Sequence, residues 1–142
     1  MKPTAKPMTR ADWEKLTDMR IREAKILLDA GEWDGAYHLA GYAVECALKV
    51  CIIKRLNTSD LWPPKQFTVD CYTHDLQLLI RLADLEVAIN GAGPVTGLWG
   101  QVANWGELSR YEHGKTLIDV QQFYNAITDP KDGVLQWIKA RW

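Results

Sequence analysis

One stretch constrains the fold of this chain more than any other: residues 36–50, which hold little except apolar side chains. Its alanines recur at intervals of three and four residues, the spacing that puts side chains on one face of an α-helix. They are Ala36, Ala40, Ala43 and Ala47. Small side chains let a neighbouring helix approach closely, and a helix that is apolar nearly all round is normally buried at the centre of a bundle. The stretch therefore predicts a central helix, running from Trp33 to about Arg55.

Three polar residues, His38, Glu45 and Lys49, share the remaining face of this predicted helix. Glu45 and Lys49 stand in the order and at the spacing that favour an ion pair within a helix. One interpretation is therefore a plain helix salt bridge. The other is that the Glu45 carboxylate orients a cationic side chain from a later segment, which predicts a contact between Glu45 and Arg110.

Length and charge limit the class of protein. The 142 residues are about the size of one domain, which we expect to span 1–142 behind a flexible arm at 1–8. The formal net charge of -1 provides no overall positive field for nucleic acid, although a local basic groove stays open. No signal peptide follows Met1 and no apolar run approaches the ~18 residues of a membrane span, so we expect a cytoplasmic protein with no membrane contact.

The cysteines agree with that location. Cys46, Cys51 and Cys71 form no C-x-x-C pair, and two of them fall in the predicted central helix. We expect reduced, structural thiols.

The segment before the central helix predicts a partner for it. Thr9 and Asp12 form a capping box that starts a helix, and Gly31 suits its C-terminal end near Ala30. The expected inner face consists of Trp13, Thr17, Ile21, Ala24 and Leu28. The short connection makes this helix and the central one an antiparallel hairpin. The outer face is basic, through Arg10, Lys15, Arg20, Arg22 and Lys25, and indicates a solvated surface more than a nucleic-acid patch.

The segment 56–72 is predicted to be a loop, because Pro63 and Pro64 favour an extended chain. Its apolar side chains favour packing over the bundle, with a lid over a site as the alternative. Thr73 is the expected N-cap of the next helix. The inner face of that helix is expected to hold Leu76, Leu79, Ile80, Ala83 and Val87.

The remaining residues predict a short helix over 96–105, a loop or single turn over 108–114, and two C-terminal helices. Thr116 caps the first of these two, and Asp129 with Pro130 starts the second, unless both form one kinked helix. No strand pattern occurs. Trp62, Trp99 and Trp105 could stack on bases or fill a core, and core packing is the favoured interpretation. The whole predicts an all-α, up-and-down bundle of four to five helices.

Catalytic signatures such as the P-loop, G-x-S-x-G and H-E-x-x-H are absent. The histidines, His38, His74 and His113, show no metal-ligand spacing, so we expect no metal and no other cofactor. Arg110 and His113 stand close together in sequence. An arginine can hold a phosphate in a bidentate way and a histidine can move a proton near neutral pH, which suits phosphodiester chemistry. The alternative is that Arg110 is a structural anchor.

Four segments, in this order, resemble the HEPN domain family (higher eukaryotes and prokaryotes nucleotide-binding). Residues 43–49, AVECALK, are similar to its A-x-E-x-x-L-K signature, and residues 30–40 to the hairpin entry that precedes it. Residues 73–79 resemble its H-x-L-x-x-L third helix, and Ser109–Tyr111 the R-Y before its last helices. The resemblance covers roughly residues 10–128.

The resemblance implies a helical bundle that usually forms a homodimer. Many members are metal-independent endoribonucleases, often toxins paired with a small nucleotidyltransferase antitoxin, and their catalytic motif is R-x4–6-H. No arginine stands at that distance before any histidine here, and the nearest match is Arg110 with His113, spaced R-x-x-H.

We therefore expect a non-catalytic RNA- or nucleotide-binding and dimerisation module in a toxin–antitoxin or defence system. The supporting residues would be Glu45, Lys49, Tyr111, His38 and His74. The alternatives are an atypical endoribonuclease that uses Arg110 and His113, and a bundle that scaffolds a protein partner.

Overall fold

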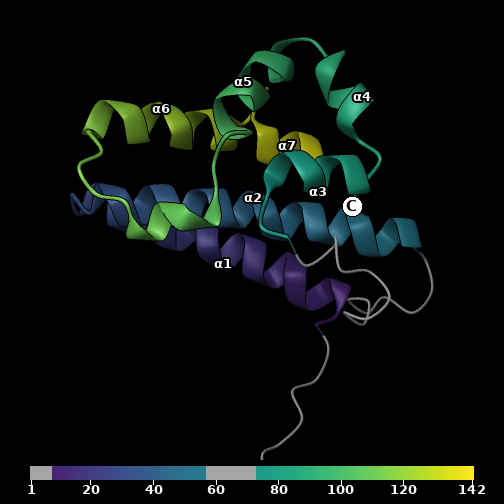
Figure 1. The fold of residues 1–142 in the computed structure, drawn as a ribbon, viewed down its shortest axis with the longest axis horizontal. Helices are drawn as coiled ribbons and strands as arrows, with labels where there is room; N and C mark the ends of the chain where they lie inside the picture. Colours follow the sequence, from purple (N-terminus) through teal and green to yellow (C-terminus); the bar gives the residue numbers. More distant parts are fainter. Residues whose placement is uncertain (1–7, 57–72) are drawn as a thin grey trace, which may run out of the picture.

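A computed structural model of the chain describes residues 8–56 and 73–142, apart from the side chain of Arg110. These residues are mostly helical and contain no β-strand (Figure 1). In chain order the helices are α1 (Arg10–Asp29), α2 (Trp33–Leu56), α3 (Leu76–Leu82), α4 (Glu86–Asn90), α5 (Pro94–Val102), the 3₁₀ helix η2 (Glu107–Tyr111), α6 (Leu117–Thr128) and α7 (Val134–Lys139). The prediction of an all-α fold is confirmed for this part of the chain.

Helices α1 and α2 form the predicted hairpin, and local hydrogen bonds fix both ends of α1. The Thr9 hydroxyl accepts from the Asp12 N–H at 3.0 Å, and the Asp12 carboxylate accepts from the Thr9 N–H at 2.9 Å. At the other end Gly31 has a φ of 82°, and the N–H of Glu32 bonds back to the carbonyl of Leu27 at 2.9 Å. This left-handed turn suits glycine, so it stops α1 and returns the chain along it.

Helix α2 is the central helix, as the alanine pattern predicts. It packs against α1, α3, η2, α6 and α7. Figure 1 shows it between α1 on one side and α3, α6 and α7 on the other. The alanine stripe is almost fully buried, with Ala40, Ala43 and Ala47 at 0% exposure. Small side chains on this face permit close helix packing.

The expectation that no segment is long and apolar enough to cross a membrane is wrong for α2. Its 24 residues reach a mean hydropathy of 1.3 over the most apolar window, and 78% of that window is buried inside the fold. The core helix of a bundle meets the same test of length and composition as a membrane span.

The single helix predicted after Thr73 is in fact two helices. The N-cap of the first one lies two residues later than predicted. Asp75, not Thr73, is the N-cap, and its carboxylate accepts from the N–H groups of Gln77 and Leu78. Helix α3 ends at Leu82 with Ala83 as its C-cap, and Asp84 directly after the cap has a φ of 60°. Because the chain reverses there, α4 starts in a new direction and Val87 is 87% exposed instead of facing inward.

The C-terminal half differs from the predictions in its boundaries. Helix α5 begins at Pro94, two residues before the predicted start, and ends at Val102. Thr116 caps α6 as predicted. Asp129 does not start a helix: its carboxylate accepts from the N–H groups of Lys131 and Asp132, which forms a turn, and α7 begins only at Val134. The two last helices are therefore separate.

The prediction that tryptophans pack in the core is confirmed for Trp99 and Trp105, which the structure describes. Trp99 is 5% exposed and Trp105 is 2% exposed. Leu56 belongs to α2, while Trp62, Cys71 and the rest of the predicted loop lie outside the described residues, as does most of the N-terminal arm.

The left-handed conformation of Asp84 gives a stability prediction. An L-residue in this region is strained by roughly 1 kcal/mol, whereas glycine is not. Asp84→Gly should raise the free energy of unfolding by about 0.5–1 kcal/mol in urea denaturation. Asp84→Asn is the matched control, because it removes the charge at the helix end and keeps the backbone preference. If the glycine variant is no more stable than the asparagine variant, the claim that Asp84 is strained is contradicted.

Candidate ligand-binding site

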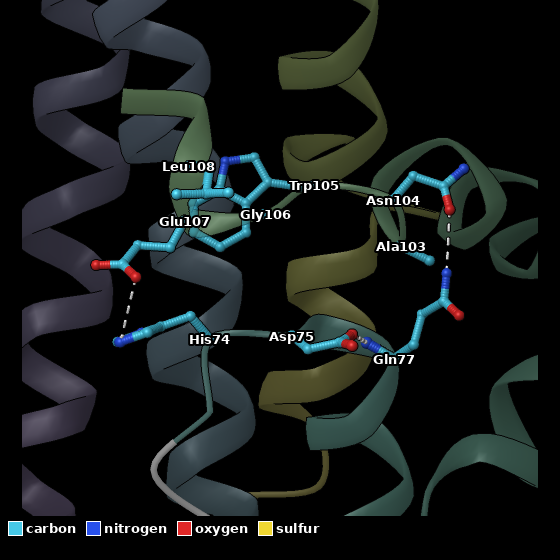
Figure 2. A pocket seen from close by; sticks show the side chains of 9 residues that line it. All are labelled: His74, Asp75, Gln77, Ala103, Asn104, Trp105, Gly106, Glu107 and Leu108. Carbon is cyan, nitrogen blue, oxygen red and sulfur yellow. Dashed lines mark hydrogen bonds and ion pairs between the residues drawn. The ribbon is translucent and has the colours of Figure 1, made fainter. Parts of the chain in front are cut away.

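Two surface hollows share the side chains of His74 and Glu107. The Gln77 hollow has a volume of about 440 Å³ and is lined by His74, Asp75, Gln77, Ala103, Asn104, Trp105, Gly106, Glu107 and Leu108 (Figure 2). The Arg20 hollow has a volume of about 430 Å³ and is lined by Arg20, Glu23, His38, Leu39, Tyr42, His74 and Glu107. Because both contain His74 and Glu107, these two residues form a common wall.

The common wall is anchored on a carboxylate buried in the middle of α2. Glu45 is 0% exposed. Its Oε2 accepts from the ammonium of Lys49 at 2.9 Å, and both carboxylate oxygens lie within 3.0–3.1 Å of His74 Nδ1. Lys49 Nζ also lies 4.9 Å from the centre of the Trp13 ring, a cation–π contact with α1. The Glu45–Lys49 pair therefore joins α1, α2 and the residue before the N-cap of α3.

The Glu45 carboxylate also fixes the orientation of His74. A carboxylate only accepts hydrogen bonds, so His74 Nδ1 carries the hydrogen. The other ring nitrogen, Nε2, lies 3.6 Å from Oε2 of Glu107, which is an ion-pair distance and not a hydrogen bond. Figure 2 shows this pair as the dashed line between His74, just before α3, and Glu107, the first residue of η2. The imidazole of His74 is 43% exposed, so Nε2 can meet a ligand.

Two stacked rings on α2 line the Arg20 hollow. The rings of His38 and Tyr42 are parallel to within 2°, with centroids 6.4 Å apart. Arg20, from α1, pairs with Glu23 and has its guanidinium 6.0 Å from the centre of the Tyr42 ring. Burial raises the pKa of Tyr42 to about 12, so its phenol is neutral at pH 7. The hollow thus combines aromatic surface with one guanidinium.

A tight contact with α2 holds the segment that carries Glu107 and Ser109. The indole of Trp105 lies on Gly41, where a Cβ would come within 2.2 Å of the indole nitrogen. Within the described residues the indole N–H has no hydrogen-bond acceptor, so packing alone fixes it. Trp105 also stacks against His38, at 5.9 Å between centroids. The Ser109 hydroxyl lies 3.1 Å from His38 Nδ1, which orients that ring as well.

The predicted site residues divide into two groups. Glu45, Lys49, His38 and His74 come together around the hollows, and the predicted Glu45–Lys49 salt bridge is confirmed, although it is buried. Tyr111 is 69% exposed and His113 is exposed, and neither lines the Gln77 hollow or the Arg20 hollow. The expected contact between Glu45 and Arg110 lies outside the described side chains.

Arg110 and His113 do not share one helical turn. Helix η2 ends at Tyr111, and Glu112 is extended, with a φ of -86° and a ψ of 154°. The chain after His113 is fixed elsewhere, because the N–H groups of Gly114 and Lys115 both donate to the Asp34 carboxylate. The helical turn that contains Arg110 therefore does not continue to His113.

Other chemistry is limited in this region. Burial raises the pKa of the Cys46 thiol to about 12, so the thiol is neutral and a poor nucleophile at pH 7. Within residues 8–56 and 73–142, no three of the side chains that commonly bind metals gather in one place.

Sequence reasoning missed five residues of the Arg20 hollow as site residues: Arg20, Glu23, Leu39, Tyr42 and Glu107. The spacing of His38 and Tyr42, four residues apart, was the available signal for Tyr42. Comparison of the chain with protein-family models, with curated proteins and with solved structures gives no match.

The contact between Gly41 and Trp105 gives a prediction about the site. Gly41→Ala should lower the free energy of unfolding by about 1–3 kcal/mol, because the indole must leave its place on α2. Gly35→Ala is the matched control on the same helix. Its Cβ would lie 3.2 Å from a terminal methyl carbon of Leu27, which can move, so it should gain up to about 1 kcal/mol from helix propensity. Equal effects of the two substitutions in chemical denaturation would contradict this account.

Proposed function

We propose that this protein is a HEPN-like helical bundle that binds a nucleotide, or a short single-stranded RNA segment, in the Arg20 hollow without cleaving it. The observation that carries the proposal is the pair of parallel rings, His38 and Tyr42, with Arg20 beside them in one concave surface. Stacking of a base on an aromatic side chain contributes about 1–3 kcal/mol and tolerates any sequence. An arginine next to the rings suits the phosphate that accompanies each base.

The same proposal includes the cellular setting that the family resemblance implies. It describes a cytoplasmic homodimer in a toxin–antitoxin or defence system, with a nucleotidyltransferase antitoxin as a partner. Exposed apolar side chains near η2 and the start of α6 are consistent with a protein contact there; they are Leu108, Tyr111, Leu117 and Ile118.

A second candidate function is metal-independent cleavage of RNA. The observation that favours it is the Glu45–His74 pair, because a carboxylate-oriented histidine with its other nitrogen toward a hollow is the arrangement of a general base. His38 lines the same hollow and could supply the leaving-group proton. In this candidate the acid–base residues are His38 and His74, instead of Arg110 and His113.

The binding proposal predicts a specific loss in one variant. Arg20→Gln should weaken binding of a fluorescently labelled single-stranded RNA at least tenfold in fluorescence anisotropy. Arg22→Gln is the control, because Arg22 is exposed on the same helix and lines neither hollow. One arginine–phosphate contact should contribute about -0.7 to the slope of log K against log salt concentration. Absence of binding, or equal weakening of binding by both substitutions, would contradict the proposal.

Cleavage is tested in the same preparation. The wild-type protein should leave a mixed-sequence RNA intact in the presence of EDTA, as judged by gel electrophoresis. RNA degradation that disappears in both His74→Ala and His38→Ala, and persists in His113→Ala, would instead establish the second candidate.

A further inference from the structure

The two nitrogens of the His74 ring face carboxylates from two different elements. Nδ1 donates to Glu45 of α2 at 3.0–3.1 Å, and Nε2 lies 3.6 Å from Oε2 of Glu107 in η2. A histidine changes charge near neutral pH, so the nature of the second contact depends on one proton. We propose that His74 and Glu107 form a pH switch, which holds η2 against the start of α3 when His74 is protonated and releases it when His74 is neutral.

The neutral ring of His74 has no hydrogen to donate to Glu107. Its one N–H is at Nδ1, where it bonds to Glu45, so Nε2 presents a lone pair. A lone pair and a carboxylate oxygen are both acceptors and repel each other. The protonated ring carries a second hydrogen, at Nε2, together with a positive charge, which makes the same contact an ion pair. Protonation therefore turns a repulsive contact into an attractive one.

Helix α2 supplies two further titratable groups near this ring, and both have partners of their own. The ammonium of Lys49 lies 2.9 Å from the Glu45 carboxylate and offsets its charge. The other group is His38, whose Nδ1 lies 3.1 Å from the Ser109 hydroxyl. Because Lys49 balances Glu45, the charge that the Nε2 proton of His74 meets is that of Glu107.

The charges on the neighbouring helices leave the same contact in place. On α1, Arg20 pairs with Glu23, so this wall of the Arg20 hollow adds little net charge. Asp75, which follows His74, accepts from the N–H groups of Gln77 and Leu78. Figure 2 shows the Asp75 side chain directed toward Gln77, whereas the Glu107 side chain reaches toward the ring of His74.

The contact lies where a small movement changes the surface. His74 and Glu107 form the common wall of the Gln77 hollow and the Arg20 hollow. Their side chains are 43% and 33% exposed, so the proton exchanges with solvent. When the contact is lost, this wall opens, while the packing of Trp105 on Gly41 keeps the segment on α2. The switch thus alters the shape of the surface and leaves the fold intact.

The test compares the wild type with Glu107→Gln by urea denaturation at about pH 5.5 and about pH 8, on either side of the range in which histidines titrate. Glutamate carboxyls titrate near roughly 4.3, so they stay ionised at both values. At the lower pH the unfolding constant of the wild type should be about two- to fivefold smaller than that of the variant. At the higher pH this advantage should vanish or reverse, because the glutamine amide can donate to the neutral Nε2.

Two controls assign the effect to His74. Glu112→Gln is the matched one, because Glu112 is an exposed carboxylate just beyond η2 that pairs with Lys115 and not with a histidine. Its effect on stability should be equal at the two pH values. In a His74→Gln background, Glu107→Gln should also have the same effect at both values, which separates His74 from His38 in the same hollow.

Amide hydrogen exchange gives a local measurement that needs only the surface substitution. The N–H groups of Ser109 and Glu112 bond to the carbonyls of Gly106 and Ser109 within and at the end of η2. Their protection factors should fall about two- to fivefold from the lower to the higher pH in the wild type, as the ion pair is lost. They should stay constant in Glu107→Gln.

Two results would overturn the inference. One is a difference in stability between the wild type and Glu107→Gln that is the same at both pH values. The other is a change in the protection of η2 with pH that is equal in the two proteins. Neither measurement uses a ligand, so failure of the proposed binding function leaves this test unaffected.

Discussion

The buried carboxylate of Glu45 is the interaction on which the rest of this structure depends. A carboxylate at 0% exposure in the middle of a core helix is strongly unfavourable unless charged and hydrogen-bonding partners satisfy it. Here Lys49 supplies the charge from the same helix, and His74 supplies a hydrogen bond from the residue before the N-cap of α3. Lys49 in turn lies over the ring of Trp13 in α1. The polar group therefore fixes how α1 and the start of α3 meet α2, which apolar packing alone would leave less specific.

The site follows from this anchor and from one glycine. Glu45 orients the ring of His74 toward the two hollows, and the bare backbone of Gly41 lets Trp105 lie on α2. Trp105 brings the next residues to the same place, so that Ser109 reaches His38 and Glu107 approaches His74. A ligand surface is thus assembled from α1, α2, α3 and η2 around groups that the core already holds in position.

Periodicity and capping residues predicted α1, α2 and the start of α6, because both signals depend on neighbours in sequence. The alanine stripe predicts α2, and Thr9, Gly31 and Thr116 mark helix ends correctly. Asp84 could not be predicted as a break, since a left-handed aspartate leaves no pattern in the apolar positions. The pairing of His74 with Glu45 and the stacking of Trp105 on Gly41 join residues far apart in sequence. One sequence alone does not reveal such contacts, and the histidine was foreseen as a supporting residue without its partner.

A double-mutant cycle on Glu45 and Lys49 tests the central claim most directly. Free energies of unfolding would be measured by urea denaturation for Glu45→Gln, Lys49→Met and the double variant. If the carboxylate is a buried, satisfied charge, Lys49→Met alone costs about 3–5 kcal/mol, because it strips the ammonium from the buried anion. The double variant then recovers much of that loss, with a coupling of about 2 kcal/mol or more. Single effects that add to within about 0.5 kcal/mol would contradict the account.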